Sequence, residues 1–215
     1  MTVNGPCRSH FDQVYRSNLM KFLSKWDEVY PTLFPEFQSL AKMWNRGVLT
    51  ASHERVLILN DDLKIPVNSE MSFFEHFERT LEVAPETFII NGSFSHFVVS
   101  KKELMEVGFF DERLLGLGEE DGDFYWRYHE KYNREIPEIA IELIENIHSD
   151  VTDGGYTKGI RTASQFNRDF MKMTKYKDML FGGYRGMFDK RVKKLLVDEI
   201  QYPYEDFYRK NKERL

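Results

Sequence analysis

The sequence has 215 residues, 41% of them hydrophobic, and a formal net charge of -5, so it is long enough to bury a core without crosslinks. A single cysteine, Cys7, excludes an internal disulfide. No charged-then-apolar leader and no long apolar run is present, so we expect a soluble, cytoplasmic protein with no transmembrane segment.

Charge is unevenly distributed along the chain. Residues 161–215 carry 14 Lys and Arg against 8 Asp and Glu, whereas the residues before them are strongly acidic. An acidic body disfavours nucleic acid as a partner. The basic, aromatic-rich tail could meet a polyphosphate, an anionic membrane or the body itself, or it could be a solvated helical face.

The first 50 residues predict short strands and two helices. Residues 1–3 and 26–31 read as possible strands, and residues 9–23 have the apolar spacing of a helix. A second helix is expected to start in the turn that contains Pro35 and to be capped by Gly47.

The apolar run of residues 56–59 predicts a strand buried on both faces. Helices and strands alternate after it. The further expected elements are a helix in 68–85, strands in 87–92 and 95–100, a helix in 101–107 with a capping box at Ser100 and a stop at Gly108, a helix from about Glu120, a strand in 138–148, and helices in the tail. This order predicts an α/β fold, in which ligands collect at the carboxyl ends of strands.

The first candidate site follows the apolar strand, at Asn60, Asp61 and Asp62. Carboxylates are hard oxygen ligands, and Mg²⁺ or Mn²⁺ is commonly held by one or two of them together with substrate phosphates. A solvated strand-to-turn junction is the alternative, because Asn and Asp are ordinary turn residues.

The second candidate is GLGEEDGDFYWR, residues 116–127, where four acidic residues crowd the start of a helix. Crowding by like charges raises a carboxyl pKa toward values useful for a general base. The alternative is that the acids only stabilise the helix N-terminus. His148, directly after an apolar strand, is the third candidate; it could be a metal ligand or a structural histidine.

Together these features resemble a known family. The strand that ends in the NDD triplet, the string VGFFDERLLGLGEEDGDF and the histidine after a strand resemble the GT-A glycosyltransferases, most closely family two. The stretch GLGEEDGDFYWR is also similar to the acceptor loop of the β-1,4-galactosyltransferases. The resemblance covers residues 36 to about 150. It implies a GT-A, Rossmann-like mixed sheet flanked by helices, in a catalytic domain at 1–159 whose nucleotide-binding N-terminal part is abbreviated. From its own composition, we expect residues 160–215 to form a basic helical extension packed on this domain.

The resemblance also implies site residues, which are carried over by position. Asp62 would be the principal ligand of a divalent cation, Mn²⁺ favoured over Mg²⁺, and His148 a further ligand. Asp121 falls on the catalytic base of inverting members. The remaining positions are Asn60 and Asp61 near the ribose and the metal, Asn91 and Gly92 at the donor sugar, and Glu120 and Gly118 at the acceptor. Asn60 departs from the aspartate that usually opens the triplet.

The expected function is therefore transfer of a hexose from a nucleotide-diphosphate sugar, UDP-sugar favoured, to a hydroxyl of a glycan acceptor, with inversion. A sugar-phosphate nucleotidyltransferase is the first alternative, although residues 4–10 make a poor basic phosphate-binding loop. A non-catalytic module that binds a sugar or a partner protein is the second.

Overall fold

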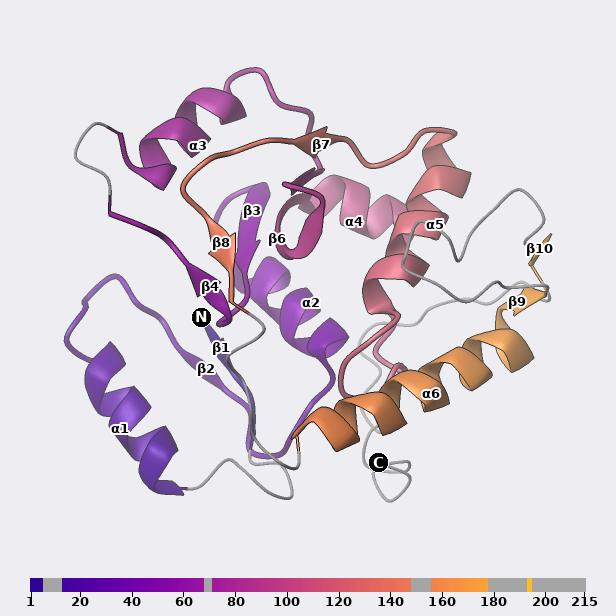
Figure 1. The fold of residues 1–215 in the computed structure, drawn as a ribbon, viewed down its shortest axis with the longest axis horizontal. Helices are drawn as coiled ribbons and strands as arrows, with labels where there is room; N and C mark the ends of the chain where they lie inside the picture. Colours follow the sequence, from indigo (N-terminus) through magenta and orange to yellow (C-terminus); the bar gives the residue numbers. More distant parts are fainter. Residues whose placement is uncertain (6–12, 68–70, 148–155, 178–192, 195–215) are drawn as a thin grey trace. The chain divides into compact units, whose positions relative to one another are not determined.

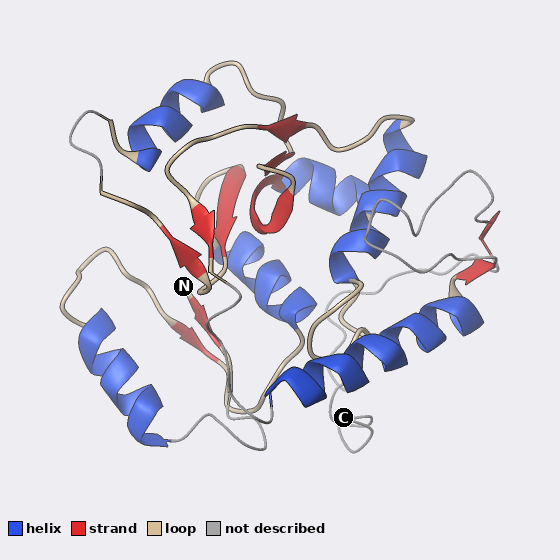
Figure 2. Ribbon diagram, viewed as in Figure 1, coloured by secondary structure: helices blue, strands red, loops and turns tan. Residues whose placement is uncertain are grey.

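The computed structural model describes residues 1–5, 13–67, 71–147, 156–177 and 193–194 (Figure 1). Helices and several small sheets make a mixed α/β structure, so the predicted α/β class is confirmed (Figure 2). The chain divides into two compact units. The first unit comprises Met1–Gly47, Phe109–Phe124 and Asp153–Leu215, and the second comprises Val48–Gly108 and Tyr125–Thr152.

The second unit is built on a four-stranded sheet with the order β3-β6-β5-β7. Strand β6 is antiparallel to both of its neighbours, and β5 is parallel to β7. Consequently β3, β5 and β7 run in one direction, and their carboxyl ends share one edge of the sheet. The strands are β3 (Arg55–Leu59), β5 (Phe88–Ile90), β6 (Ser93–Ser100) and β7 (Glu138–Ile139).

Strand β3 forms where the apolar run predicts it, but it is an edge strand of this sheet. Four of its residues are partly buried and Leu59 is 38% exposed. The prediction of a strand buried on both faces is therefore wrong. The fully buried strand is β5, in which all three residues are shielded from solvent.

A hydrophobic core covers one face of this sheet. Phe73 and Phe77 of α3 (Phe73–Leu81) pack there with Phe88, Val98 and Ile141. Helix α3 begins at a capping box, in which Ser72 accepts from the Glu75 amide and the Glu75 side chain accepts from the Ser72 amide. The expected helix in 68–85 is confirmed over the described part.

The remaining elements of the second unit are short. Helix α4 (Lys101–Val107) starts at the predicted N-cap, Ser100, and ends at Gly108, which has a φ of +90°. The predicted strand in 138–148 is two separate pieces, β7 and β8 (Glu145–Asn146), and β8 pairs antiparallel with β4 (Leu63–Lys64).

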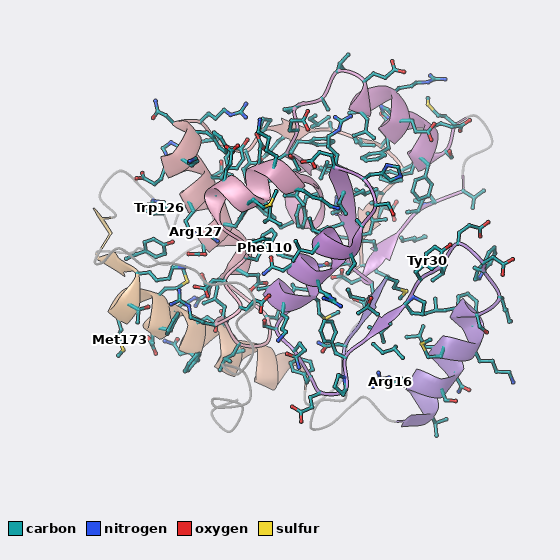
Figure 3. The ribbon with its side chains drawn as sticks, turned by 180° about the vertical axis from the view of Figure 1, so that it is seen from behind. Arg16, Tyr30, Phe110, Trp126, Arg127 and Met173 are labelled. Atoms are coloured by element: carbon teal, nitrogen blue, oxygen red, sulfur yellow. The ribbon has the colours of Figure 1, made fainter. Side chains whose placement is uncertain are left out.

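Among its described residues, the first unit contains two pairs of short strands and two complete helices. Asn45 of helix α2 (Leu40–Thr50) is buried in this unit and bonds the backbone of Phe110, with Nδ2 donating to the carbonyl over 2.8 Å and Oδ1 accepting from the amide over 3.0 Å. Phe110, labelled in Figure 3, packs its ring 4.4 Å from that of Phe124 and 5.0 Å from that of Trp44. The elements are β1 (Thr2–Val3) parallel to β2 (Thr32–Leu33), α1 (Gln13–Leu23), α6 (Tyr156–Thr174), and β9 (Tyr176–Lys177) antiparallel to β10 (Lys193–Lys194).

Two helices run from one unit into the other. The helices are α2 (Leu40–Thr50) and α5 (Glu120–Tyr132). The structure confirms the predicted helix start at Glu120. Arg127 of α5 (Figure 3) donates through Nη1 to the carbonyls of Val107 and Gly108, and this ties the helix to the end of α4 within the second unit.

Two predictions near the N-terminus are wrong. Residues 26–31 form turns in place of a strand, with the amide of Val29 donating to Trp26 O over 3.2 Å. Helix α2 begins at Leu40, several residues after Pro35, and Gly47 lies inside it. The physical reason for the late start is Asn4, whose Oδ1 accepts from the Gln38 amide over 2.7 Å and whose Nδ2 donates to the Gln38 carbonyl over 3.0 Å. These bonds hold the segment before α2 out of the helix.

Candidate active site

The triplet Asn60, Asp61 and Asp62 forms the turn between β3 and β4 in the second unit. The amide of Asn60 donates to Ser95 O over 2.9 Å, and Asp62 O accepts from the amide of Ile147 over 2.9 Å. Asp61 is exposed, whereas Asp62 is partly buried and its Oδ1 is shielded from solvent. Backbone hydrogen bonds on both sides therefore fix the position of Asp62 at the carboxyl end of β3.

His148, the predicted second metal ligand, lies outside the described residues. The residue before it, Ile147, is held against Asp62 by the hydrogen bond just given. Within the described ranges, no group of three or more His, Cys, Asp and Glu side chains is arranged to hold a metal ion. A cation at Asp62 would therefore need ligands from substrate, water or other residues in addition.

A histidine that the sequence analysis did not single out lies near Asp62. Strand β6 pairs His96 directly with Leu59 of β3, and His96 is 3% exposed. Neither of its ring nitrogens has a hydrogen-bond partner among the residues that the structure describes. Burial lowers the pKa of His96, and the charge of Asp62 opposes that shift. The one available signal was a polar residue inside the apolar run SHFVVS.

Asn91 and Gly92 form the two-residue turn of the β5–β6 hairpin. Both have positive φ, +50° and +71°, as the mirror-image hairpin turns require. The Asn91 side chain also bonds the backbone of Ile141, donating to its carbonyl over 2.7 Å and accepting from its amide over 2.9 Å. The pair thus has a structural role, and its place at a donor sugar stays a prediction.

Strand register brings the residues predicted at the donor to one edge of the sheet. Ile90, before the hairpin turn, pairs with Ser93, and Ser95 accepts from Asn60. Both turns therefore follow the carboxyl ends of strands that run in the same direction, β5 and β3. This is the edge at which ligands collect in open α/β sheets.

The acidic loop, residues 116–119, belongs to the first unit and leads into α5. Gly118 has a φ of +114° and Glu119, although not a glycine, has a φ of +77°. The amide of Gly118 donates to Glu120 Oε2 over 2.7 Å, and the amide of Gly122 donates to Asp121 Oδ1 over 2.8 Å. The two carboxylates thus bind amides at the start of the helix, where negative charge is favoured.

Helix α6 holds this loop in shape. Asn167 is fully buried and bonds Leu115 on both sides, accepting from its amide over 2.7 Å and donating to its carbonyl over 3.0 Å. The same Nδ2 donates to Gly118 O over 2.7 Å. Arg168 donates through Nε to Glu119 Oε1 over 2.6 Å. Sequence reasoning missed these contacts because a lone Asn or Arg on an amphipathic helix usually faces solvent.

The surroundings of Glu120 and Asp121 favour the protonated forms of their carboxyl groups. Burial, together with the charges of Asp121 and Glu119, raises the pKa of Glu120 to about 8. Burial and the charge of Glu119 raise the pKa of Asp121 to about 6. At neutral pH the pair therefore carries mainly one negative charge, on Asp121. A carboxylate with such a pKa is suited to accept a proton from a substrate hydroxyl.

A second buried cluster in the first unit is fully paired. Lys175 donates to Asp111 Oδ2 over 2.8 Å and lies 2.6 Å from Asp123 Oδ1. Arg113 bonds Asp111 through Nε and Nη2, and the hydroxyl of Tyr176 donates to Asp123. Burial alone would raise the pKa of Asp111, but Lys175 and Arg113 lower it. This cluster joins the chain after α6 to residues 111–113 and to the first turn of α5.

The structure groups the predicted site residues in two sets, one in each unit. The set in the second unit consists of Asn60, Asp61, Asp62, Asn91 and Gly92, and the set in the first unit consists of Gly118, Glu120 and Asp121. The predicted boundary between residues 159 and 160 stays a prediction.

No protein-family model matches this sequence, and no curated protein matches it either. Across the parts of the chain that the structure describes, no helix is both long enough and apolar enough to cross a membrane.

Proposed function

We propose that this protein is a metal-dependent, inverting glycosyltransferase that moves a hexose from a nucleotide-diphosphate sugar, UDP-sugar favoured, to a hydroxyl of a glycan acceptor. The observation that carries the proposal is the carboxyl pair Glu120 and Asp121, held by a loop that Asn167 and Arg168 fix in place. One or two acids are enough to stabilise a helix N-terminus, whereas here the pKa values of Glu120 and Asp121 are also raised toward neutrality.

In this proposal Asp121 is the general base. It is mainly ionised at neutral pH, because the pKa is raised only to about 6, so it can take the proton of an acceptor hydroxyl. Glu120 keeps its proton at neutral pH and thereby adds no second charge beside the base. A Cβ at Gly118 would lie 3.1 Å from Ser164 Cβ, so glycine allows the backbone of the proposed acceptor loop to lie close to α6.

On the donor side, the proposed ligands of a divalent cation are Asp62 and His148, with Mn²⁺ favoured. Such a cation supplies Lewis acidity, which offsets the charge that grows on the leaving diphosphate. The buried imidazole near Asp62 fits a cation of this class, since oxygen and imidazole ligands together suit Mn²⁺. Asn60 and Asp61 are assigned to the ribose and the metal, and Asn91 and Gly92 to the sugar.

The reaction is a single displacement. The acceptor oxygen forms a bond to the anomeric carbon while the bond from that carbon to the diphosphate oxygen breaks and leaves its electron pair on the phosphate. The acceptor proton passes to Asp121. Attack from the face opposite the leaving group inverts the configuration.

Replacing the base tests the proposal directly. Asp121→Asn should lower sugar transfer by about 10²–10⁴-fold and leave the affinity for the nucleotide diphosphate within twofold of the wild type. Glu130→Gln changes an exposed carboxylate on the same helix and should leave transfer unaltered. If Asp121→Asn transfers sugar as fast as Glu130→Gln, the role of Asp121 is wrong.

A thermal-shift panel with Mn²⁺ and several nucleotide diphosphates separates the proposal from its alternatives. Stabilisation that needs both components, and that Asp62→Ala abolishes while the exposed Glu78→Gln retains it, supports the transferase. No shift with any of them at millimolar concentration favours a non-catalytic module. Release of pyrophosphate from a nucleoside triphosphate and a sugar phosphate identifies a nucleotidyltransferase.

A further inference from the structure

His96 is a buried imidazole whose hydrogen-bonding groups are not satisfied by the described residues around it. It lies on β6, between two strands of the sheet, and is 3% exposed. Both Nδ1 and Nε2 are shielded from solvent, and neither has a hydrogen-bond partner in the described part of the chain. A neutral imidazole has one N–H to donate and one lone pair to fill, so a group that meets at least one of these needs is expected beside it.

The Asp62 turn directly follows the strand that pairs with His96. His96 pairs with Leu59, the last residue of β3, and the next residue, Asn60, donates its amide to Ser95 O over 2.9 Å. Asp62 follows two residues later, and its negative charge acts on His96. These residues all lie within the second unit, and the register of β3 on β6 fixes where the turn begins.

The unpartnered ring nitrogens of His96 suit a ligand. A neutral imidazole offers one lone pair to a cation, and no described residue occupies either nitrogen of His96. Asp62 contributes carboxylate oxygen, which is a hard donor. A carboxylate combined with an imidazole favours Mn²⁺ or another transition cation over Mg²⁺, which prefers oxygen ligands throughout.

We propose that His96 is a ligand of the divalent cation held by Asp62, and that it makes the position selective for Mn²⁺ over Mg²⁺. This deepens the function proposed above and rests on it for the assignment of a cation to Asp62. The residue that makes the site selective for Mn²⁺ is thus on β6, the strand that follows the Asn91–Gly92 turn.

Electron paramagnetic resonance of the full chain with bound Mn²⁺ tests this without relying on activity. Electron spin echo modulation from an imidazole nitrogen should be present in the wild type and disappear or weaken in His96→Gln. Titration of the free Mn²⁺ signal should show at least tenfold weaker binding in His96→Gln, whereas Mg²⁺ affinity, measured by competition, should change by less than twofold. His53→Gln removes an exposed histidine of the same unit and should alter none of these quantities.

Each result decides something. Absence of nitrogen modulation in the wild type with Mn²⁺ bound overturns the inference even if His96→Gln does not fold, and so does modulation of full strength in a folded His96→Gln. Loss of the modulation in His148→Gln alone assigns the nitrogen to that residue and also overturns it. If His96→Gln transfers sugar and binds Mn²⁺ as tightly as the wild type, the inference about His96 is wrong and the proposed function stands. If the wild type binds Mn²⁺ through His96 but transfers no sugar, only the proposed function is wrong.

Discussion

Lys175 Nζ lies 2.8 Å from Asp111 Oδ2, and both side chains are almost completely buried. A buried ion pair is costly to form, because both charges leave water, but it is more costly to break from one side only. Lys175 also lies 2.6 Å from Asp123, so one ammonium group neutralises two carboxylates of the first unit. Its partners lie before α5 and in the first turn of α5, and Lys175 directly follows α6.

Asp111→Asn should therefore lower the free energy of unfolding by about 3–5 kcal/mol, because Lys175 and Arg113 lose a buried counter-charge. Urea denaturation of the full chain measures the change. Asp27→Asn alters an exposed aspartate of the same unit and should change stability by less than about 0.5 kcal/mol. Equal effects of the two substitutions would show that the buried pair contributes nothing.

The buried Glu120 predicts a loss of stability in alkaline solution. Its pKa is raised from 4.5 to about 8, so the folded state binds the proton more tightly than the unfolded chain does. The stability that this proton contributes is fully present below pH 4.5 and is lost as the pH rises through 8. The decrease in Tm between pH 6 and pH 9 should be smaller in Glu120→Gln than in the wild type, and the exposed Glu28→Gln should behave as the wild type does. An identical decrease in Glu120→Gln would refute this.

Gly118→Ala should destabilise the acidic loop. A φ of +114° is strained for any residue with a Cβ, and the new atom would lie 3.1 Å from Ser164 Cβ. We expect a loss of about 1–3 kcal/mol in the free energy of unfolding. Gly47→Ala is the matched control, because Gly47 lies inside α2 and its Cβ would meet Thr2 Cγ2 at an ordinary 3.8 Å. That change should stabilise by up to about 1 kcal/mol, and a reversed order of the two variants would contradict the described loop geometry.

Asn91→Gly separates the turn from the hydrogen bonds of its side chain. Glycine keeps the positive φ but leaves the amide and carbonyl of Ile141 without Asn91, so we expect a loss of about 1–3 kcal/mol in chemical denaturation. Asn133→Gly tests the backbone alone, because Asn133 is exposed and has the same φ of +50°. It should be neutral within about 0.5 kcal/mol. Equal stability of the two variants would remove the structural role of the Asn91 side chain.

Local patterns predicted the elements whose ends are set by neighbouring residues. Ser100 and Gly108 bound α4, and Glu120 begins α5. The Asn91–Gly92 turn was not predicted, because residues 87–92 were expected to be strand throughout, whereas β5 ends at Ile90. The start of α2 was missed because Asn4, more than 30 residues away, bonds Gln38. The carboxylates of the candidate site were found because acidic residues are clustered in the sequence.

Residues that act alone were not found. His96 is one polar residue in an apolar strand, Asn167 is one amide on a helix, and Lys175 is one base in a basic tail. Each becomes informative only through burial and its neighbours in space, which no periodicity encodes. The burial of β3 was overestimated for a related reason, because an apolar run does not indicate whether a strand is central or at an edge.

The bond pattern of Asn167 couples two segments that are about 50 residues apart. Its side chain accepts from the amide of Leu115 and donates to the carbonyl, as a neighbouring strand would. Leu115 can exchange its amide hydrogen with solvent only when this contact opens, which requires α6 to separate from the loop. Amide exchange at Leu115 therefore reports the free energy with which α6 detaches, and slow exchange there would mean that the acidic loop and α6 unfold as one cooperative segment.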